Sequence, residues 1–165
     1  MIYRPCIYLM GFFGLFVAPM ARADHFSIDL EAKAGEKSRI AVMNTTALGA
    51  KPKSRGVLET KTGKPITVKW TVKYTAKQGM VKDAMIHFFV VKVEKVGQAA
   101  LPNLNKDVAA ESALTMDFKP KDKTEGELTF TIEAAGNYLL RLETVKTATG
   151  DDGHEHFAAL DIVVK

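Results

Sequence analysis

The chain has 165 residues, a formal net charge of +4 and a single cysteine. This length suits one domain with a substantial core and is short for two. The lysines are spread among acidic residues without a basic block, which indicates a soluble protein and speaks against nucleic acid as its partner.

The first 23 residues have the layout of a signal peptide. An arginine stands near the amino end, an apolar run of 12 residues follows at 7–18, and Ala-Arg-Ala at 21–23 supplies the small-x-small pattern that signal peptidase cleaves. The run is shorter than the roughly 20 residues that a membrane-spanning helix needs. The alternative is that it is kept as an amino-terminal anchor or a buried helix. We predict cleavage before Asp24, a mature domain at 24–165, a periplasmic or secreted location, and no stable membrane anchor after processing.

Removal of this leader changes the chemistry that the protein can offer. The leader holds the only cysteine, Cys6, so the mature domain has no disulfide, thiol nucleophile or thiolate metal site. It also holds two arginines and no acidic residue, so the net charge falls to +2. His25 becomes the second residue of the mature chain, beside a new amino group.

From residue 26 onward the pattern is that of successive short β-strands. Strict alternation of apolar and polar residues predicts half-buried strands at 26–31, 66–75 and 127–133. The nearly continuous apolar run at 85–93 predicts a central strand that is covered on both sides at its start. Further strands are expected at 138–145 and 156–164, with weaker ones at 39–43, 56–60 and 113–118. Seven to nine strands separated by glycine- and proline-containing turns predict an all-β, two-sheet antiparallel sandwich.

One connection is longer than the others. Residues 97–111 lack a clean period and contain a proline and two asparagines. We expect a long loop there with a short helical turn. Long loops in compact domains often carry function, so this is the best candidate for a functional loop.

The segment 135–142, Ala-Gly-Asn-Tyr-Leu-Leu-Arg-Leu, resembles the penultimate strand of immunoglobulin-like and fibronectin-type sandwiches. In that strand a glycine turn precedes a tyrosine that packs at the sheet corner and bonds its hydroxyl to nearby backbone, a role that Tyr138 would take. Together with the mature start at 24–31 and the histidine-rich last strand, the segment also resembles a bacterial periplasmic family found beside nickel and cobalt uptake systems. That resemblance implies an Ig-like sandwich that handles a transition metal.

Histidines are the residues that could carry metal chemistry. His154 and His156 point to the same side of a strand, so they could present two imidazoles to one copper, nickel or zinc ion. Asp152, or else Asp151 or Glu155, could add an oxygen ligand or orient one of the rings, and the third imidazole would come from His25 or His87. The alternatives are a solvated hairpin turn at 151–156 and, for His87, a half-buried histidine with its hydrogen bonds satisfied.

The sequence contains no familiar catalytic template. Gly-x-Ser-x-Gly, a phosphate-binding glycine loop and His-Glu-x-x-His are all absent. We therefore expect an exported non-catalytic binding or interaction domain of unknown partner, which is not an enzyme. The alternative is a periplasmic transition-metal binding or delivery protein. A hydrolase or oxidoreductase whose site assembles from loops is a third hypothesis.

Overall fold

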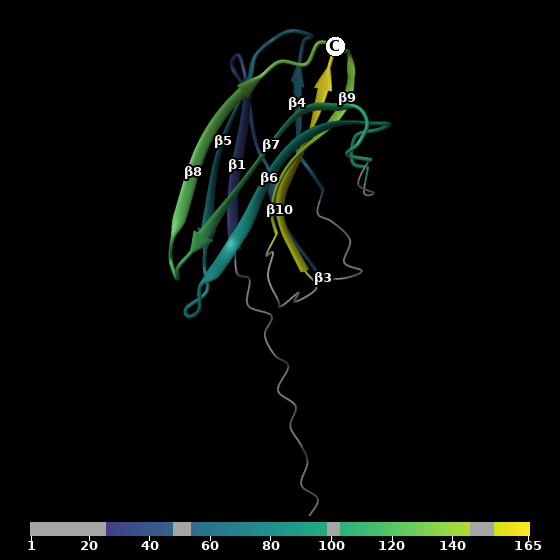
Figure 1. Ribbon diagram of the computed structural model, residues 1–165. Helices are drawn as coiled ribbons and strands as arrows, with labels where there is room; N and C mark the ends of the chain where they lie inside the picture. The colour runs from purple at the N-terminus through teal and green to yellow at the C-terminus, as the bar shows by residue number, and fades with distance from the viewer. Residues whose placement is uncertain (1–25, 48–53, 99–102, 146–153) are drawn as a thin grey trace, which may run out of the picture.

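The computed structural model describes residues 26–47, 54–98, 103–145 and 154–165 (Figure 1). All regular structure in these residues is β-strand. The ten strands are β1 (Phe26–Ala34), β2 (Lys37–Ile40), β3 (Val42–Ala47), β4 (Val57–Thr60), β5 (Ile66–Tyr74), β6 (Val81–Val93), β7 (Val108–Phe118), β8 (Lys123–Phe130), β9 (Gly136–Val145) and β10 (His154–Val164). The predicted signal peptide at 1–23 lies outside the described residues. Within the described part, no helix is long and apolar enough to span a membrane.

The strands form two sheets that pack face to face (Figure 1). Sheet 1 has the order β2-β1-β5-β8. Sheet 2 has the order β3-β10-β9-β6-β7, and β4 also pairs with β10. The predicted all-β, two-sheet sandwich is therefore confirmed.

The strand count differs from the prediction. The single weak strand expected at 39–43 is divided, because the chain changes sheets at Ala41, whose N–H donates to the Leu30 carbonyl at 2.8 Å. β2 thus pairs with β1, and β3 pairs with the first half of β10. The second half of β10 pairs with β4, which runs parallel to it and is the exception among the otherwise antiparallel pairings of the described strands.

The alternating residues of β1 and β5 fill the space between the sheets. In β5, every second residue from Ile66 to Tyr74 is buried, and the residues between them face water. β1 shows the same period from Phe26 to Ala34. This is the half-buried arrangement that period-two alternation predicts.

β8 lies earlier than the predicted range 127–133. It pairs with β5 along its whole length, from Phe130 opposite Ile66 to Lys123 opposite Lys73, and ends where β5 ends. Its inward positions include Gly126, over which the Trp70 indole lies. A Cβ atom on Gly126 would be 2.2 Å from Trp70 Cζ2, so the absence of a side chain is what makes room for the ring.

β6 is the central strand that the apolar run predicts, but its doubly covered part lies in the second half. Phe88–Val91 are buried on both faces. The inner face of the strand joins the main core. On the outer face of sheet 2, residues of β6, β9 and β10 form a second cluster, against which Leu104 and Val108 pack. That cover comes from the connection after β6, and it explains why the burial begins late in the strand.

The described part of the predicted loop 97–111 therefore acts as a cover. It forms turns without a helix in the residues described, and its last four positions already belong to β7. Near the start of β9, beside the end of β6, the Tyr138 hydroxyl donates to the Ala134 carbonyl at 2.8 Å. This confirms the corner hydrogen bond predicted for Tyr138.

Candidate interaction surfaces

Of the five predicted metal ligands, the structure describes the side chains of only two, His87 and His156. His25 and Asp152 lie outside the described residues. His154 begins β10 opposite Ala47, and its side chain is likewise outside the description. His87 and His156 are described in full. These two side chains therefore test whether the predicted histidines could converge.

His87 and His156 lie on opposite faces of sheet 2. His156 pairs with Thr144, which pairs with Ile86 of the main core, so all three face inward. His87 is the next residue along β6 and pairs with Glu143, so it faces outward. The His156 ring is buried, with its centroid 5.9 Å from that of Phe26. One ion therefore cannot be bound by both histidines, and His87 is excluded as the third ligand of a site built on His156.

Both ring nitrogens of His87 have hydrogen-bond partners, as expected for the alternative of a half-buried histidine with its hydrogen bonds satisfied. Its side chain is 12 % exposed and lies between two carboxylates. The distance from Nε2 to Glu111 Oε1 is 2.8 Å, and that from Nδ1 to Glu143 Oε1 is 3.3 Å. Glu143 is also paired with Arg141 at 2.7 Å, and the Arg141 guanidinium stacks 3.8 Å above the centre of the Phe157 ring. The described residues contain no group of three or more His, Cys, Asp or Glu side chains that could hold a metal ion.

A buried ion pair between Arg55 and Asp161 joins the connection after β6 to strand β10 of sheet 2. Arg55 Nε and Nη2 donate to the carboxylate of Asp161 at 3.2 and 3.1 Å, and the Gly97 N–H donates to the same carboxylate at 3.1 Å. Arg55 also donates to the Gln98 carbonyl at 2.7 Å. Sequence reasoning missed this pair, although one signal was present, since Asp161 is the one charged residue in the otherwise apolar stretch 157–164.

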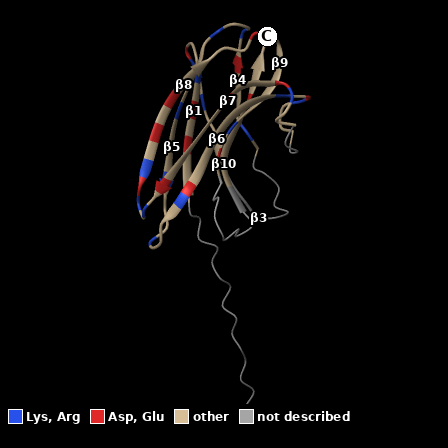
Figure 2. Ribbon diagram, viewed as in Figure 1, with Lys and Arg blue, Asp and Glu red and all other residues tan. Residues whose placement is uncertain are grey.

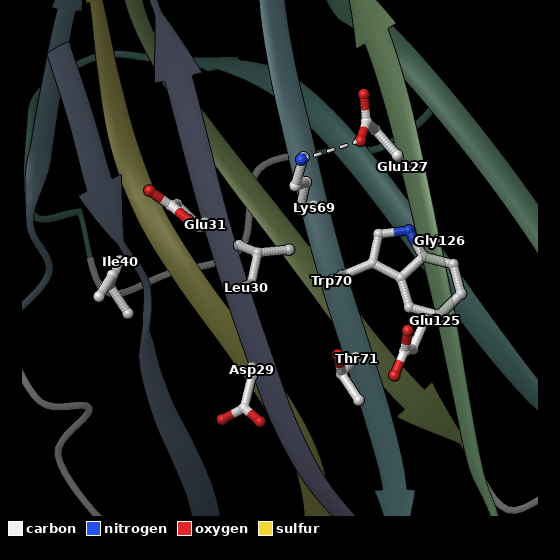
Figure 3. Close-up of a pocket in the computed structure, with 10 residues that line it drawn as sticks. All are labelled: Asp29, Leu30, Glu31, Ile40, Lys69, Trp70, Thr71, Glu125, Gly126 and Glu127. Carbon is white, nitrogen blue, oxygen red and sulfur yellow. Dashed lines mark ion pairs between the residues drawn. The ribbon is translucent and has the colours of Figure 1, made fainter. Parts of the chain in front are cut away.

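A shallow hollow lies on the outer face of sheet 1 (Figure 3). Its lining comes from β1, β2, β5 and β8: Asp29, Leu30, Glu31, Ile40, Lys69, Trp70, Thr71, Glu125, Gly126 and Glu127. Four of these ten residues are acidic and one is basic. Ile40, which is 73 % exposed, supplies an apolar side chain on β2.

The charges around this hollow are largely compensated within the protein. Three exposed ion pairs line or border it: Lys73–Asp29 at 2.8 Å, Lys69–Glu127 at 3.4 Å and Lys123–Glu125 at 2.6 Å. The hydrogen bond and charge of Asp29 raise the pKa of Lys73, and those of Lys123 lower the pKa of Glu125. Exposed pairs of this kind contribute little to stability. The hollow is therefore a solvent-exposed surface whose charged side chains mostly form ion pairs with each other.

β7 presents the most unusual surface. It is the last strand of sheet 2, so its outer edge has no strand partner in the described ranges. It has eleven residues, of which only Glu111 and Asp117 are charged. Edge strands are usually short, or protected by lysines and prolines. β8, at the edge of sheet 1, carries charges in this way, whereas β7 is mostly uncharged (Figure 2).

The middle of β7 is both regular and exposed. Ala110–Met116 pair residue by residue with Ala84–Val90 of β6, and a register shift interrupts the ladder on either side. Residues 111–115 are all exposed, including Leu114 at 39 %. An unpaired strand edge offers a row of free backbone N–H and C=O groups to another strand. β7 is therefore the described surface best suited to contact with another chain.

Comparison with known proteins assigns no family. No family model matches the chain, and no curated protein matches it. The resemblance to the family found beside nickel and cobalt uptake systems therefore stays a prediction.

Proposed function

We propose that this chain is an exported, non-catalytic binding domain that takes a protein partner by strand addition along β7. The supporting observation is the free edge of β7, which is long, regular, exposed and poorly protected by charge. In strand addition, main-chain hydrogen bonds supply affinity and alternate side chains supply specificity. Such binding needs no catalytic group and no cofactor.

The engaged polar groups support the same proposal. His87 is held between two carboxylates, and Asp161 is held by Arg55 and a backbone N–H. Most of the charged side chains that border the hollow on sheet 1 are paired with each other. Because these side chains are already paired within the protein, the free backbone edge of β7 is the best candidate for contact with a partner.

Export rests on the signal-peptide pattern at 1–23. It would place the domain in a bacterial periplasm or outside the cell. A mature chain without cysteine suits either place, because its stability comes from packing and does not depend on redox state. Expression of the full chain in a bacterium, followed by intact-mass measurement, should give a product that starts at Asp24. A product that keeps residues 1–23 would contradict export by this route.

Site-directed photocrosslinking in the producing organism tests the binding edge. A photoreactive amino acid is introduced at Ala113 or Thr115 of β7, and as a matched control at Thr129, an exposed position of β8. We expect adducts with a protein from both β7 positions and not from the control. Adducts from Thr129 alone, or none from β7, would contradict the proposal.

One contact favours a second candidate function, transition-metal binding. The Phe26 ring lies against the ring of His156, and Phe26 directly follows His25 in the sequence. We propose as the alternative that His154, His156 and His25 bind copper, nickel or zinc, with Asp152 as an oxygen ligand. Calorimetry of the mature protein with each metal tests this. His154→Ala should abolish the heat, and a mature protein that binds none of the three metals would exclude this function.

A further inference from the structure

The regular part of β7 is centred on one residue. The seven residues Ala110–Met116 form its uninterrupted ladder with β6, and Ala113 is the middle one. We infer that the partner of β7 is a second copy of this chain, paired antiparallel about a two-fold axis at Ala113. This inference rests on the proposed strand addition and names its occupant. The two copies of sheet 2 would then join into one continuous sheet.

The side chains of β7 are compatible with themselves in this register. Like charges that face each other directly across two strands are destabilising. Glu111 stands opposite Thr115 of the second copy, so this register avoids such a pair. Met116 stands opposite Ala110, which pairs a large side chain with a small one. Leu114 stands opposite Ser112 of the second copy, with the other Leu114 as its diagonal neighbour, roughly 7–8 Å away.

This pairing would remove the features that make β7 unusual as an edge. In an antiparallel strand, every second residue directs its N–H and C=O groups away from the existing partner, so pairing over seven residues adds about six to eight hydrogen bonds. The exposed Leu114 gains apolar neighbours. A two-fold contact uses the same surface on both copies and closes on itself, which prevents growth into a fibre.

A charge-exchange experiment tests the inference. Ala113 is exposed and would face its own copy on the axis, so Ala113→Lys or Ala113→Glu would place two like charges opposite each other. Ala113→Thr is the matched control, because it adds bulk without charge and suits a strand. In sedimentation analysis, we expect the mature wild-type chain and the threonine variant to have twice the mass of one chain. Each charged variant should fall to the mass of one chain, and an equimolar mixture of the two should recover the doubled mass.

A cysteine variant provides a second readout, which does not depend on a charge being tolerated in the fold. The mature chain contains no cysteine, so Ala113→Cys introduces one thiol per copy. Directly opposite residues of an antiparallel pair have Cβ atoms about 4.5–5.5 Å apart, close to the separation in a disulfide. Mild oxidation should therefore link most chains into dimers, whereas Thr129→Cys on β8 should stay largely monomeric.

These results separate this inference from the proposed function. A wild-type chain that stays monomeric, or a lysine variant that keeps the doubled mass, overturns self-pairing at Ala113. Equal oxidation of the two cysteine variants overturns it as well. If self-pairing fails while β7 still forms photoadducts with a different protein, strand addition stands with another partner. If β7 forms no adducts of either kind, both proposals fail.

Discussion

Removal of Arg55 is expected to cause one of the largest losses of stability available in this domain. The Arg55 and Asp161 side chains are 7 % and 1 % exposed, and their closest atoms are 3.1 Å apart. Arg55→Met would take away two of the three hydrogen bonds that the Asp161 carboxylate accepts, leaving the Gly97 N–H. Breaking a buried ion pair by removing one partner costs about 3–5 kcal/mol, because the remaining charge is uncompensated.

The effect can be measured by urea and thermal unfolding of the mature protein. A loss of this size would lower the unfolding midpoint by roughly 10–17 °C in a domain of this length. Arg55→Met/Asp161→Leu removes both charges, and replacing a whole buried pair by apolar residues is often nearly neutral. We therefore expect the double variant to be more stable than Arg55→Met alone.

The matched control breaks an exposed ion pair. Lys37→Met removes an ion pair on the surface, in which Lys37 Nζ lies 3.5 Å from Glu59 Oε2. We expect no measurable change in stability from this substitution. If Arg55→Met changes the free energy of unfolding no more than Lys37→Met does, the proposed stabilising role of the buried pair is wrong. A double variant less stable than Arg55→Met would contradict the charge-burial explanation.

Three further predictions concern other parts of the sandwich. Gly126→Ala places a methyl group 2.2 Å from Trp70 Cζ2 and should cost about 1–3 kcal/mol in urea unfolding, and Trp70→Leu in the same chain should remove most of that penalty. Tyr138→Phe removes the corner hydrogen bond and should cost about 1 kcal/mol in urea unfolding. Burial raises the pKa of Tyr138, so absorbance titration should find it above the ordinary value for a tyrosine. The hydrogen bond and charge of Lys165 lower the pKa of Glu59 from its ordinary value. Any stabilisation by this pair is therefore present at a pH above the unfolded-state pKa of Glu59, and it is lost as the pH falls through the folded-state pKa. A carboxyl NMR titration should show this lowered pKa and its rise in Lys165→Met, and equal midpoints in the two proteins would contradict the assignment.

The apolar/polar alternation of the sequence predicts those strands in which each apolar residue is buried and each polar residue faces water. β1 and β5 were expected from alternation alone, and the structure buries every second residue in each. β8 was expected four residues too late at its start, because the inward positions Thr124 and Gly126 are polar or small and hide the period. Its true limits follow from pairing with β5, which is a long-range contact.

The candidate surface could not be predicted in the same way. The alternation of a strand shows which of its faces is buried, but it does not show which strand has no neighbour. β7 was therefore expected only as a weak strand at 113–118, and its position at the edge of sheet 2 depends on the order of all the strands. The opposite faces of His87 and His156 have the same origin, since they follow from the register between β6, β9 and β10.

Amide hydrogen exchange of β7, followed by NMR as a function of protein concentration, tests the central claim most directly. If β7 binds a second strand, alternate N–H groups within Ala110–Met116 should become more protected as concentration rises, while the N–H groups already bonded to β6 stay unchanged. The free edge of β8 should show no such change. Protection in β7 that is independent of concentration, or that rises along β8 instead, would contradict self-pairing through this edge.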